Sequence, residues 1–153
     1  MSYPITKSCY EKLYDELMQL KRQRPEISAR IDEARGHGDL KENAEYHAAR
    51  DEQGLSEARI AVIEGKLSEA NIIDPTTLLK DKVYFGSTLE IENIETGELK
   101  TIQIVSEDEV SVSNGKISIN SPIAKEALSK KVGDTFIVYA PRGELEYEII
   151  NII

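Results

Sequence analysis

The feature that most constrains the fold is a heptad stripe near the start of the chain. Stepping alternately by four and three residues from Leu13 to Ala34 reaches a largely apolar series, interrupted at Arg24. This spacing places side chains along one seam of a helix and is typical of coiled coils. A helix with one apolar seam needs a partner to cover it. The stripe consists of Leu13, Leu17, Leu20, Arg24, Ile27, Ile31 and Ala34.

Local signals mark the ends of this helix. Ser8 followed three residues later by Glu11 fits a capping box, with Thr6 as a competing N-cap. The glycines within residues 36–38 are expected to end the helix. Pro25 lies inside the pattern, where it removes a backbone donor and clashes with the preceding turn. We therefore expect a kink or bulge about one turn before Pro25.

A second run of related spacing predicts a returning helix. Only residues 36–38 separate the two runs, and such short connections join antiparallel neighbours, so the pair is expected to form a hairpin. At 1.5 Å per residue, a helix of about 28 residues is roughly 42 Å long. The second run carries Tyr46, Ala49, Ile60, Ile63, Leu67 and Ala70, with Gln53 and Ser56 at weaker middle positions.

The periodicity changes to two after Pro75, which predicts strands and a domain boundary near residues 75–81. The predicted fold class is α+β. Residues 1–75 form an antiparallel two-helix coiled-coil hairpin with an acidic tip near 36–46, and residues 80–153 form a small antiparallel sheet. One short helix should open with Ser121 as N-cap and Pro122 at N1, and end near Leu128. The expected strands are residues 87–94, 99–105, 109–113, 116–119, 134–139 and 144–152.

Composition limits the classes of partner. The formal net charge of -9 disfavours direct, sequence-independent binding to nucleic acid, so a protein partner is expected. The single cysteine, Cys9, cannot form an internal disulfide. No signal peptide or membrane-spanning run is present, so a cytoplasmic location without membrane contact is expected. Positive side chains gather along the first helix at Lys21, Arg22, Arg24, Arg30 and Arg35.

Three acids near the hairpin connection have two interpretations. Asp39, Glu42 and Glu45 are spaced three residues apart, so they share roughly one helix face. In the first interpretation, Asp39 is the N-cap of the second helix and Glu42 its N3 partner. In the second, these carboxylates help to hold Mg²⁺ or orient a water at the end of the hairpin. The two roles are compatible, because one carboxylate oxygen can cap while the other faces outward.

The sequence gives little indication of a self-contained active site. His37 and His47 flank the acids and are expected to have local electrostatic roles rather than to act as bases or ligands. The sequence contains no Gly-rich phosphate loop, Ser-His-Asp set or paired CxxC. Two or three carboxylates leave most of a metal's coordination sphere empty, so a partner would have to supply the remaining ligands.

The segment GDLKENAEYHAAR, residues 38–50, resembles the tip and second helix of the GreA/GreB family of bacterial transcript-cleavage factors. The residues in this segment favour the A type of the family over the B type. The resemblance extends over essentially the whole chain. Its further motifs are Arg24-Pro25-Glu26, Val83-Tyr84-Phe85-Gly86, Ile119-Asn120-Ser121-Pro122-Ile123-Ala124 and Pro141-Arg142-Gly143.

This resemblance implies a fold and a partner. The second domain would be FKBP-like and would dock on RNA polymerase beside the secondary channel, which the coiled coil would enter as a monomer. The factor would not be an enzyme itself: it would stimulate the polymerase to cleave the 3′ end of backtracked nascent RNA. Asp39 and Glu42 would be the catalytic residues, holding a Mg²⁺ bound only in the polymerase complex. Asn43, Glu45 and Tyr46 would support the tip.

Two questions stay open at this stage. Lys21, Arg22, Arg24 and Arg30 either correspond to a basic patch facing RNA or form a solvated helix face. The alternative functions are a channel binder that inhibits polymerase without promoting cleavage, and a prolyl isomerase or chaperone. The latter is disfavoured because fold does not carry activity. Tyr84, Phe85, Phe136, Tyr139 and Tyr147 are expected to be core or edge aromatics.

Overall fold

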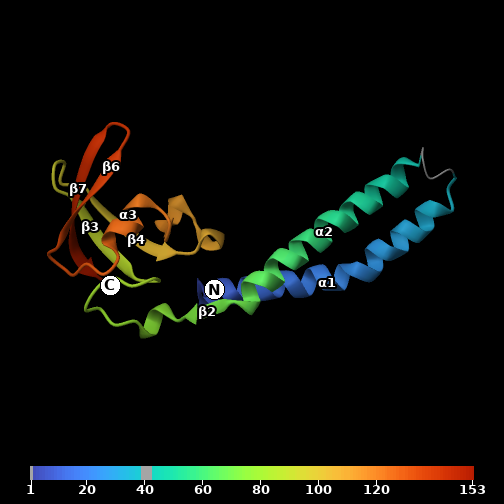
Figure 1. Cartoon of the computed structure of the whole chain (residues 1–153), viewed down its shortest axis with the longest axis horizontal. Helices are drawn as coiled ribbons and strands as arrows, with labels where there is room; N and C mark the ends of the chain where they lie inside the picture. Colours follow the sequence, from blue (N-terminus) through green and yellow to red (C-terminus); the bar gives the residue numbers. More distant parts are fainter. Residues whose placement is uncertain (1, 39–42) are drawn as a thin grey trace. The chain divides into compact units, whose positions relative to one another are not determined.

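The computed structural model describes residues 2–38 and 43–153. The predicted α+β architecture is confirmed: a helical hairpin is followed by a curled mixed β-sheet (Figure 1). The chain divides into two compact units, a hairpin unit of Tyr10–Ala70 and a C-terminal unit that combines Ser2–Cys9 with Asn71–Ile153. Within the described ranges, no helix is long and apolar enough to cross a membrane.

Helix α1 spans Lys7–Arg35 and begins two residues earlier than the capping box at Ser8 predicted. Its cap is Thr6 rather than Ser8, because the Thr6 Oγ1 accepts a hydrogen bond from the backbone N–H of Cys9 at 3.3 Å. The helix ends directly before Gly36, as predicted.

Pro25 lies inside α1 without ending it. The chain stays α-helical through the turn before the proline, so no bulge forms there. The helix axis changes direction midway along its course (Figure 1), as expected when a proline ring crowds the preceding turn.

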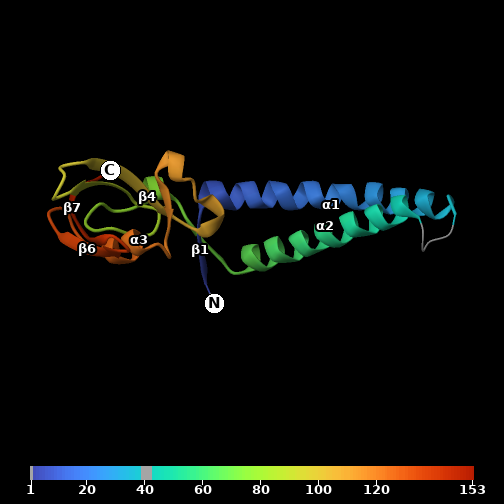
Figure 2. The ribbon, with the colours of Figure 1, turned by 90° about the horizontal axis from the view of Figure 1, so that it is seen from above.

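Helix α2 spans Ala44–Ser68 and returns antiparallel to α1, so the two form the predicted hairpin (Figure 2). Their shared seam buries the apolar residues of the heptad pattern at both ends of the hairpin. In the middle, Leu20 is only half-buried and Arg24 is exposed, as the interrupted pattern predicts. The buried seam residues in the hairpin unit are Leu13, Leu17, Ile27, Ile31, Ala34, Ala49, Ile60 and Ile63.

A second, two-stranded sheet was not predicted. It joins β1, Tyr3–Thr6, to β2, Ala70–Ile73. The sequence interpretation placed residues 1–75 in the hairpin domain, whereas Ser2–Cys9 packs with the C-terminal unit. The reason is burial: Ile5 and Thr6 are 0% and 1% exposed, which a free terminal strand could not achieve. A short 3₁₀ turn, η1, follows at Pro75–Thr77.

The main sheet has the strand order β5-β4-β3-β7-β6. Neighbouring strands are antiparallel except β4 and β5, which run parallel, so the expectation of a purely antiparallel sheet is wrong for this pair. The strand boundaries otherwise lie within two residues of those predicted. They are β3 Thr88–Asn93, β4 Leu99–Val105, β5 Lys116–Ser118, β6 Thr135–Ala140 and β7 Gly143–Ile152.

The strand predicted for residues 109–113 does not form. The connection from β4 to β5 instead contains two 3₁₀ turns, η2 at Glu107–Glu109 and η3 at Val112–Asn114. These turns carry the chain back so that β5 can start parallel to β4. Gly115 ends η3 at φ +71, and a Cβ there would lie 2.5 Å from the backbone oxygen of Thr101, so only glycine fits.

Helix α3, Pro122–Ala127, covers the inner face of the sheet with Ala124 and Ala127. Ser121 is its N-cap, as predicted, and accepts from the backbone N–H of Ala124 at 3.3 Å. Small side chains let the helix approach the sheet closely, so the core is continuous. The buried strand residues of this core include Leu89, Ile91, Ile102, Ile104, Phe136, Val138, Tyr147, Ile149 and Ile152.

Candidate functional site at the hairpin tip

The two acids of greatest interest, Asp39 and Glu42, lie outside the described residues. The chain is described up to Gly38 on the α1 side and again from Asn43 on the α2 side. The geometry of the site is therefore the geometry of these two flanks.

Asn43 fastens the α2 flank to α1. Its Oδ1 accepts a hydrogen bond from the backbone N–H of Tyr46 at 3.1 Å, which makes Asn43 the N-cap of α2. Its Nδ2 donates to the backbone oxygen of Ala34 near the end of α1. One side chain thus closes the hairpin from both helices, and we call it the Asn43 clasp.

The prediction that Asp39 caps α2, with Glu42 at N3, is wrong. The helix begins at Ala44, after both acids, and its cap is Asn43. Asparagine caps helices as well as aspartate does, and only its amide can also donate to Ala34.

The α1 flank ends in a tight turn. Gly36 and His37 donate their backbone N–H groups to the carbonyl oxygens of Glu33 and Ala34, each at 3.1 Å. Gly38 follows at φ +136, a conformation that L side chains rarely adopt. The end of α1 is therefore defined by backbone hydrogen bonds and by glycine.

Glu45, the third acid, makes a contact across the hairpin. Its Oε2 lies 3.0 Å from Nδ1 of His37, and both side chains are exposed. Glu45 stands in the first turn of α2, where the helix dipole also favours a negative charge. This places Glu45 in contact with the α1 flank and gives His37 a local electrostatic partner, as expected for that histidine.

Tyr46 packs the two flanks together. Its ring lies partly buried against Ile27, Ile31 and Ala49, and the guanidinium carbon of Arg35 is 5.9 Å from the ring centroid. His47 meets the same ring edge-on, with centroids 5.6 Å apart. Aromatic burial and a cation–π contact both favour this arrangement.

Most of the predicted basic patch is ion-paired across the hairpin. Lys21 contacts Glu64 at 3.4 Å, Arg30 contacts Glu52 at 2.8 Å, and Arg24 binds Glu57 through two bonds of 2.8 and 2.9 Å. Each glutamate offsets one positive charge, so these three side chains are not a bare cationic surface. Arg22 is exposed and has no ion pair among the described residues.

Sequence reasoning missed the acids that complete these pairs. Glu57 and its equivalents come from α2, and a fourth pair joins Arg59 to Glu16 at 2.7 Å. The hydrogen bonds from Arg24 lower the pKa of Glu57, and the same bonds raise the pKa of Arg24. The sequence did contain a signal for these ion pairs. Side chains of opposite charge lie beside the heptad seams of the two helices, and residues at such positions meet across a coiled coil.

The other predicted sites show no self-contained chemistry. Within residues 2–38 and 43–153, no group of three or more His, Cys, Asp or Glu side chains could hold a metal. Phe136 and Tyr147 are buried in the core with ring centroids 5.7 Å apart, and Tyr139 is exposed on β6. These rings are core and edge residues, as expected.

Comparisons with known proteins agree with this two-part architecture. The family model "Transcription elongation factor, N-terminal" matches residues 3–72, and "Transcription elongation factor, GreA/GreB, C-term" matches residues 78–153. Both halves therefore define a transcription elongation factor. The chain belongs to the GreA/GreB family.

Individual relatives cover nearly the full length. The chain is 54% identical over 153 residues to transcription elongation factor GreA of Psychrobacter cryohalolentis, covering 99% of this chain and 97% of that protein. It is 51% identical over 152 residues to GreA of Pseudomonas aeruginosa, covering 98% and 96%. Among solved structures, GreA factor homolog 1 of Thermus thermophilus is 30% identical, with coverage of 100% and 99% and a TM-score of 0.46.

Proposed function

We propose that this chain binds RNA polymerase, enters its secondary channel with the hairpin, and stimulates cleavage of backtracked nascent RNA. The factor itself is not the enzyme. Cleavage removes the extruded RNA 3′ end, so that an arrested complex can resume elongation. The proposal rests on membership of the GreA/GreB family and on the construction of the tip.

The observation that carries the proposal is the Asn43 clasp. Acids at the start of a helix are ordinarily explained as caps. Here α2 begins at Ala44 and its cap is supplied by Asn43, so capping accounts for neither Asp39 nor Glu42. We infer that these two acids instead serve chemistry in a partner's active site.

Reach gives the hairpin its role in this proposal. The 29 residues of α1 extend about 43 Å at 1.5 Å per residue. A hairpin of this length could carry two carboxylates at its end deep into a channel of a partner. The C-terminal domain would hold the polymerase as a monomeric factor, and the hairpin would reach the polymerase's catalytic centre.

Asp39 and Glu42 fit Mg²⁺ by the chemistry of their donor atoms, because hard divalent cations prefer carboxylate oxygens. In the polymerase complex they would hold one ion, which would supply a polarised water and charge stabilisation for phosphodiester hydrolysis. Asn43, Glu45 and Tyr46 would keep the flanks of the tip in place through the contacts described above. Arg22 is the member of the basic patch that remains available to face RNA.

The test is a cleavage assay on stalled, backtracked elongation complexes with the double variant Asp39→Asn, Glu42→Gln. We expect cleavage stimulation to be abolished while polymerase binding is unchanged, because the variants keep side-chain shape and remove the ligand charge. Full stimulation by this variant would show that the tip assignment is wrong.

The matched control is Asp32→Asn with Glu33→Gln. Both residues are exposed on the last turns of α1, and neither side chain has a hydrogen bond or ion pair within the described residues. The control removes the same charge close to the tip and should leave cleavage intact. A wild-type protein that binds polymerase but never promotes cleavage would favour the rival function of a purely inhibitory channel binder.

A further inference from the structure

The two edges of the main sheet differ in how their backbone groups are occupied. β5 forms one edge of the sheet and β6 forms the other (Figure 1). An edge strand presents a row of unpaired N–H and C=O groups, to which another extended chain can add as a further strand. Both edges lie within the C-terminal unit, so the structure of this unit alone decides which edge is open.

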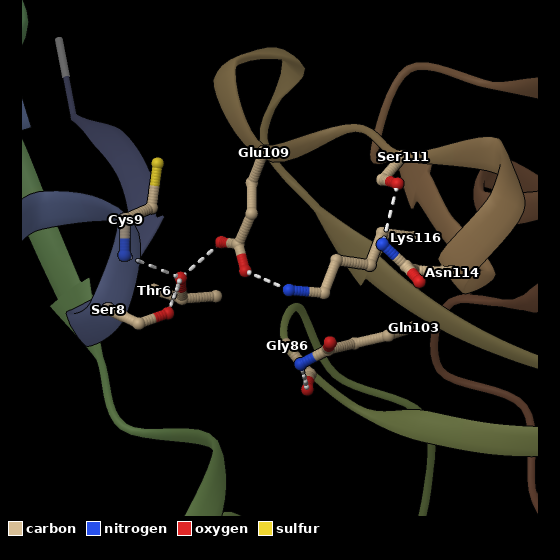
Figure 3. A network of polar contacts seen from close by, with 9 residues as sticks. All are labelled: Thr6, Ser8, Cys9, Gly86, Gln103, Glu109, Ser111, Asn114 and Lys116. Atoms are coloured by element: carbon tan, nitrogen blue, oxygen red, sulfur yellow. Dashed lines mark hydrogen bonds and ion pairs between the residues drawn. The ribbon is translucent and has the colours of Figure 1, made fainter. Parts of the chain in front are cut away.

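The β5 edge is short and covered. β5 has three residues, and Lys116 at its start exchanges two backbone hydrogen bonds with Ser111, of 2.9 and 3.0 Å. The Nζ of Lys116 also donates to the carboxylate of Glu109 at 3.2 Å (Figure 3). That carboxylate accepts a second hydrogen bond from the hydroxyl of Thr6. A short strand, a lysine and a covering segment are all features that protect an edge from pairing.

The β6 edge has none of these protections. β6 spans six residues, Thr135–Ala140, and none of them is charged or a proline. It pairs with β7 on one side only. Within residues 2–38 and 43–153, no hydrogen bond joins a residue of β6 to any segment other than β7. A long, uncharged edge strand of this kind is a site for strand addition.

The register of β6 against β7 shows which backbone groups are free. Antiparallel strands alternate between residue pairs that exchange hydrogen bonds and pairs that do not. Directly before β6, the N–H of Ile149 donates to the carbonyl of Asp134 at 3.0 Å, so the even-numbered residues of β6 bond to β7. The backbone groups of the odd-numbered residues point away from β7, along the free edge. These residues are Thr135, Ile137 and Tyr139.

The side chains beside this edge are apolar and acidic. Ile137 and Tyr139 are 37% and 73% exposed. Their partners in register on β7 are Glu146 and Glu144, and residues in register share one face of a sheet. A groove of about 270 Å³ lies at this place, lined by Ile94, Glu95, Ile137, Glu144 and Glu146. An added strand would therefore meet apolar side chains next to it and negative charge one strand further away.

The acids on this face have no ion-pair partners among the described residues. Glu148 of β7 even lies directly opposite Glu92 of β3, and like charges in that position destabilise a sheet. The face therefore favours a positively charged partner. A second copy of this chain would bring the same acids and a net charge of -9, so charge disfavours it as the occupant.

We propose that the free edge of β6 is a docking site for an extended segment of a partner protein in which basic and apolar side chains alternate. The segment adds to the sheet as a strand and bonds to the backbone of Thr135, Ile137 and Tyr139. Its lysine or arginine stems cover the two exposed side chains, and their charged heads approach the acids of β7. Its apolar side chains lie on the other face, beside the buried Phe136 and Val138. This binding involves neither the hairpin nor RNA cleavage.

The experiment titrates a synthetic peptide, capped at both ends and slightly longer than β6, into the full-length protein. The peptide alternates lysine and valine. One comparison peptide alternates glutamate and valine, and a second contains the same lysines and valines in two separate blocks. Amide NMR signals give the affinity, and hydrogen exchange reports each backbone N–H. Sedimentation of the protein alone records whether a second copy occupies the edge.

Saturating lysine–valine peptide should slow exchange at the amides of Thr135, Ile137 and Tyr139 at least about tenfold, because each gains a hydrogen bond. The amides of Phe136 and Val138 already bond to β7 and should change less. Affinity should fall as the salt concentration rises. The glutamate peptide should bind at least about tenfold more weakly, and the block peptide should not protect the three amides.

Variants of the protein separate the backbone from the charge. Ile137→Pro removes one free N–H, and proline is tolerated where the N–H of an edge strand faces solvent. It should lower affinity for the lysine–valine peptide at least about tenfold, whereas Ile137→Val should bind like the wild type. If Ile137→Pro does not fold, Ile137→Lys decides, because its charge repels the peptide.

The acid beside Ile137 has its own test. Glu146→Gln should lower affinity about two- to fivefold in low salt, the range expected for one exposed ion pair. The matched control is Glu126→Gln, which should leave affinity unchanged. Glu126 is exposed on α3, and α3 covers the opposite face of the sheet.

The proposal is overturned if the lysine–valine peptide does not bind, or if it binds without protecting Thr135, Ile137 and Tyr139. Equal protection by the glutamate or block peptide would also overturn it. A dimer of the free protein that already protects these amides would show that a second copy is the occupant. The proposed cleavage function fails or stands separately, by the behaviour of Asp39→Asn with Glu42→Gln on backtracked complexes, in which no peptide takes part.

Discussion

The hairpin and the C-terminal domain are stabilised in different ways. The C-terminal domain has one continuous core in which α3, β3, β4, β6 and β7 all take part. The hairpin instead buries short apolar stretches at its two ends, and near the tip only a small cluster of Ile27, Ile31 and Ala49 forms, with Tyr46 packed against it. The middle of the hairpin is polar.

Polar side chains from both helices occupy the middle of the hairpin. Arg24 interrupts the seam of α1 and pairs with Glu57, while the hydroxyl of Ser56 is buried without a hydrogen-bond partner in the described structure. A buried unpaired hydroxyl is unfavourable. The C-terminal domain is therefore held by packing, whereas the hairpin depends on caps, a thin seam and exposed ion pairs.

The largest expected difference comes from removing buried volume. Ile149→Ala, at a fully buried position of the sheet, should lower the free energy of unfolding of the C-terminal domain by about 2 to 5 kcal/mol, because a cavity remains in a closed core. Ile31→Ala in the small tip cluster should cost less, since solvent and neighbouring side chains can fill the gap. Region-resolved hydrogen exchange in urea measures the loss of stability in each variant. Equal losses in the two variants would contradict the proposed difference between the domains.

A medium effect is expected at the Asn43 clasp. Asn43→Ala should lower the local stability of the α2 start by about 1 kcal/mol through loss of the cap. The amide of Tyr46 should then exchange faster, while exchange in the sheet is unchanged. Asn43→Asp separates the two bonds, because aspartate keeps the cap but cannot donate to Ala34. Unchanged exchange in both variants would mean that the clasp does not stabilise the tip.

The smallest effect is expected for the exposed pair of Arg24 and Glu57. The pKa of Glu57 is lowered, so its contribution to hairpin stability is present above the ordinary value of 4.5 and is lost as the pH falls through the lowered pKa. The stability difference between wild type and Glu57→Gln should therefore shrink as the pH falls below 4.5 and should also shrink in high salt. Glu26→Gln, an exposed acid of the same hairpin, is the control, and a difference that persists in acid would contradict the ion-pair explanation.

Sequence periodicity predicted the hairpin and most strands because their side chains repeat with periods of 3.5 and 2. It failed at residues 109–113, where two valines in alternation suggested a strand but 3₁₀ turns formed. It also missed β1 and the bond between Thr6 and Glu109. Nothing local in a sequence brings position 6 to position 109, since only the tertiary fold closes that distance.

At the hairpin tip, too, local sequence did not predict a contact between segments. Its acids were found by motif, and the glycines at the end of α1 by turn chemistry. The helix start was misplaced because Asp39 and Asn43 are both good caps, and spacing alone does not choose between them. The choice depended on the carbonyl of Ala34, which comes from the other helix and can accept a hydrogen bond from an asparagine amide but not from an aspartate carboxylate.

The Asn43 clasp also makes the hairpin a modular scaffold. Because Asn43 and Ala34 join the two helices on the helix side of residues 39–42, that four-residue stretch is bracketed by a hydrogen bond that does not involve it. A different tetrapeptide could be grafted there while the start of α2 keeps its own cap. Chemistry at the end of the hairpin can thus change independently of the scaffold that delivers it.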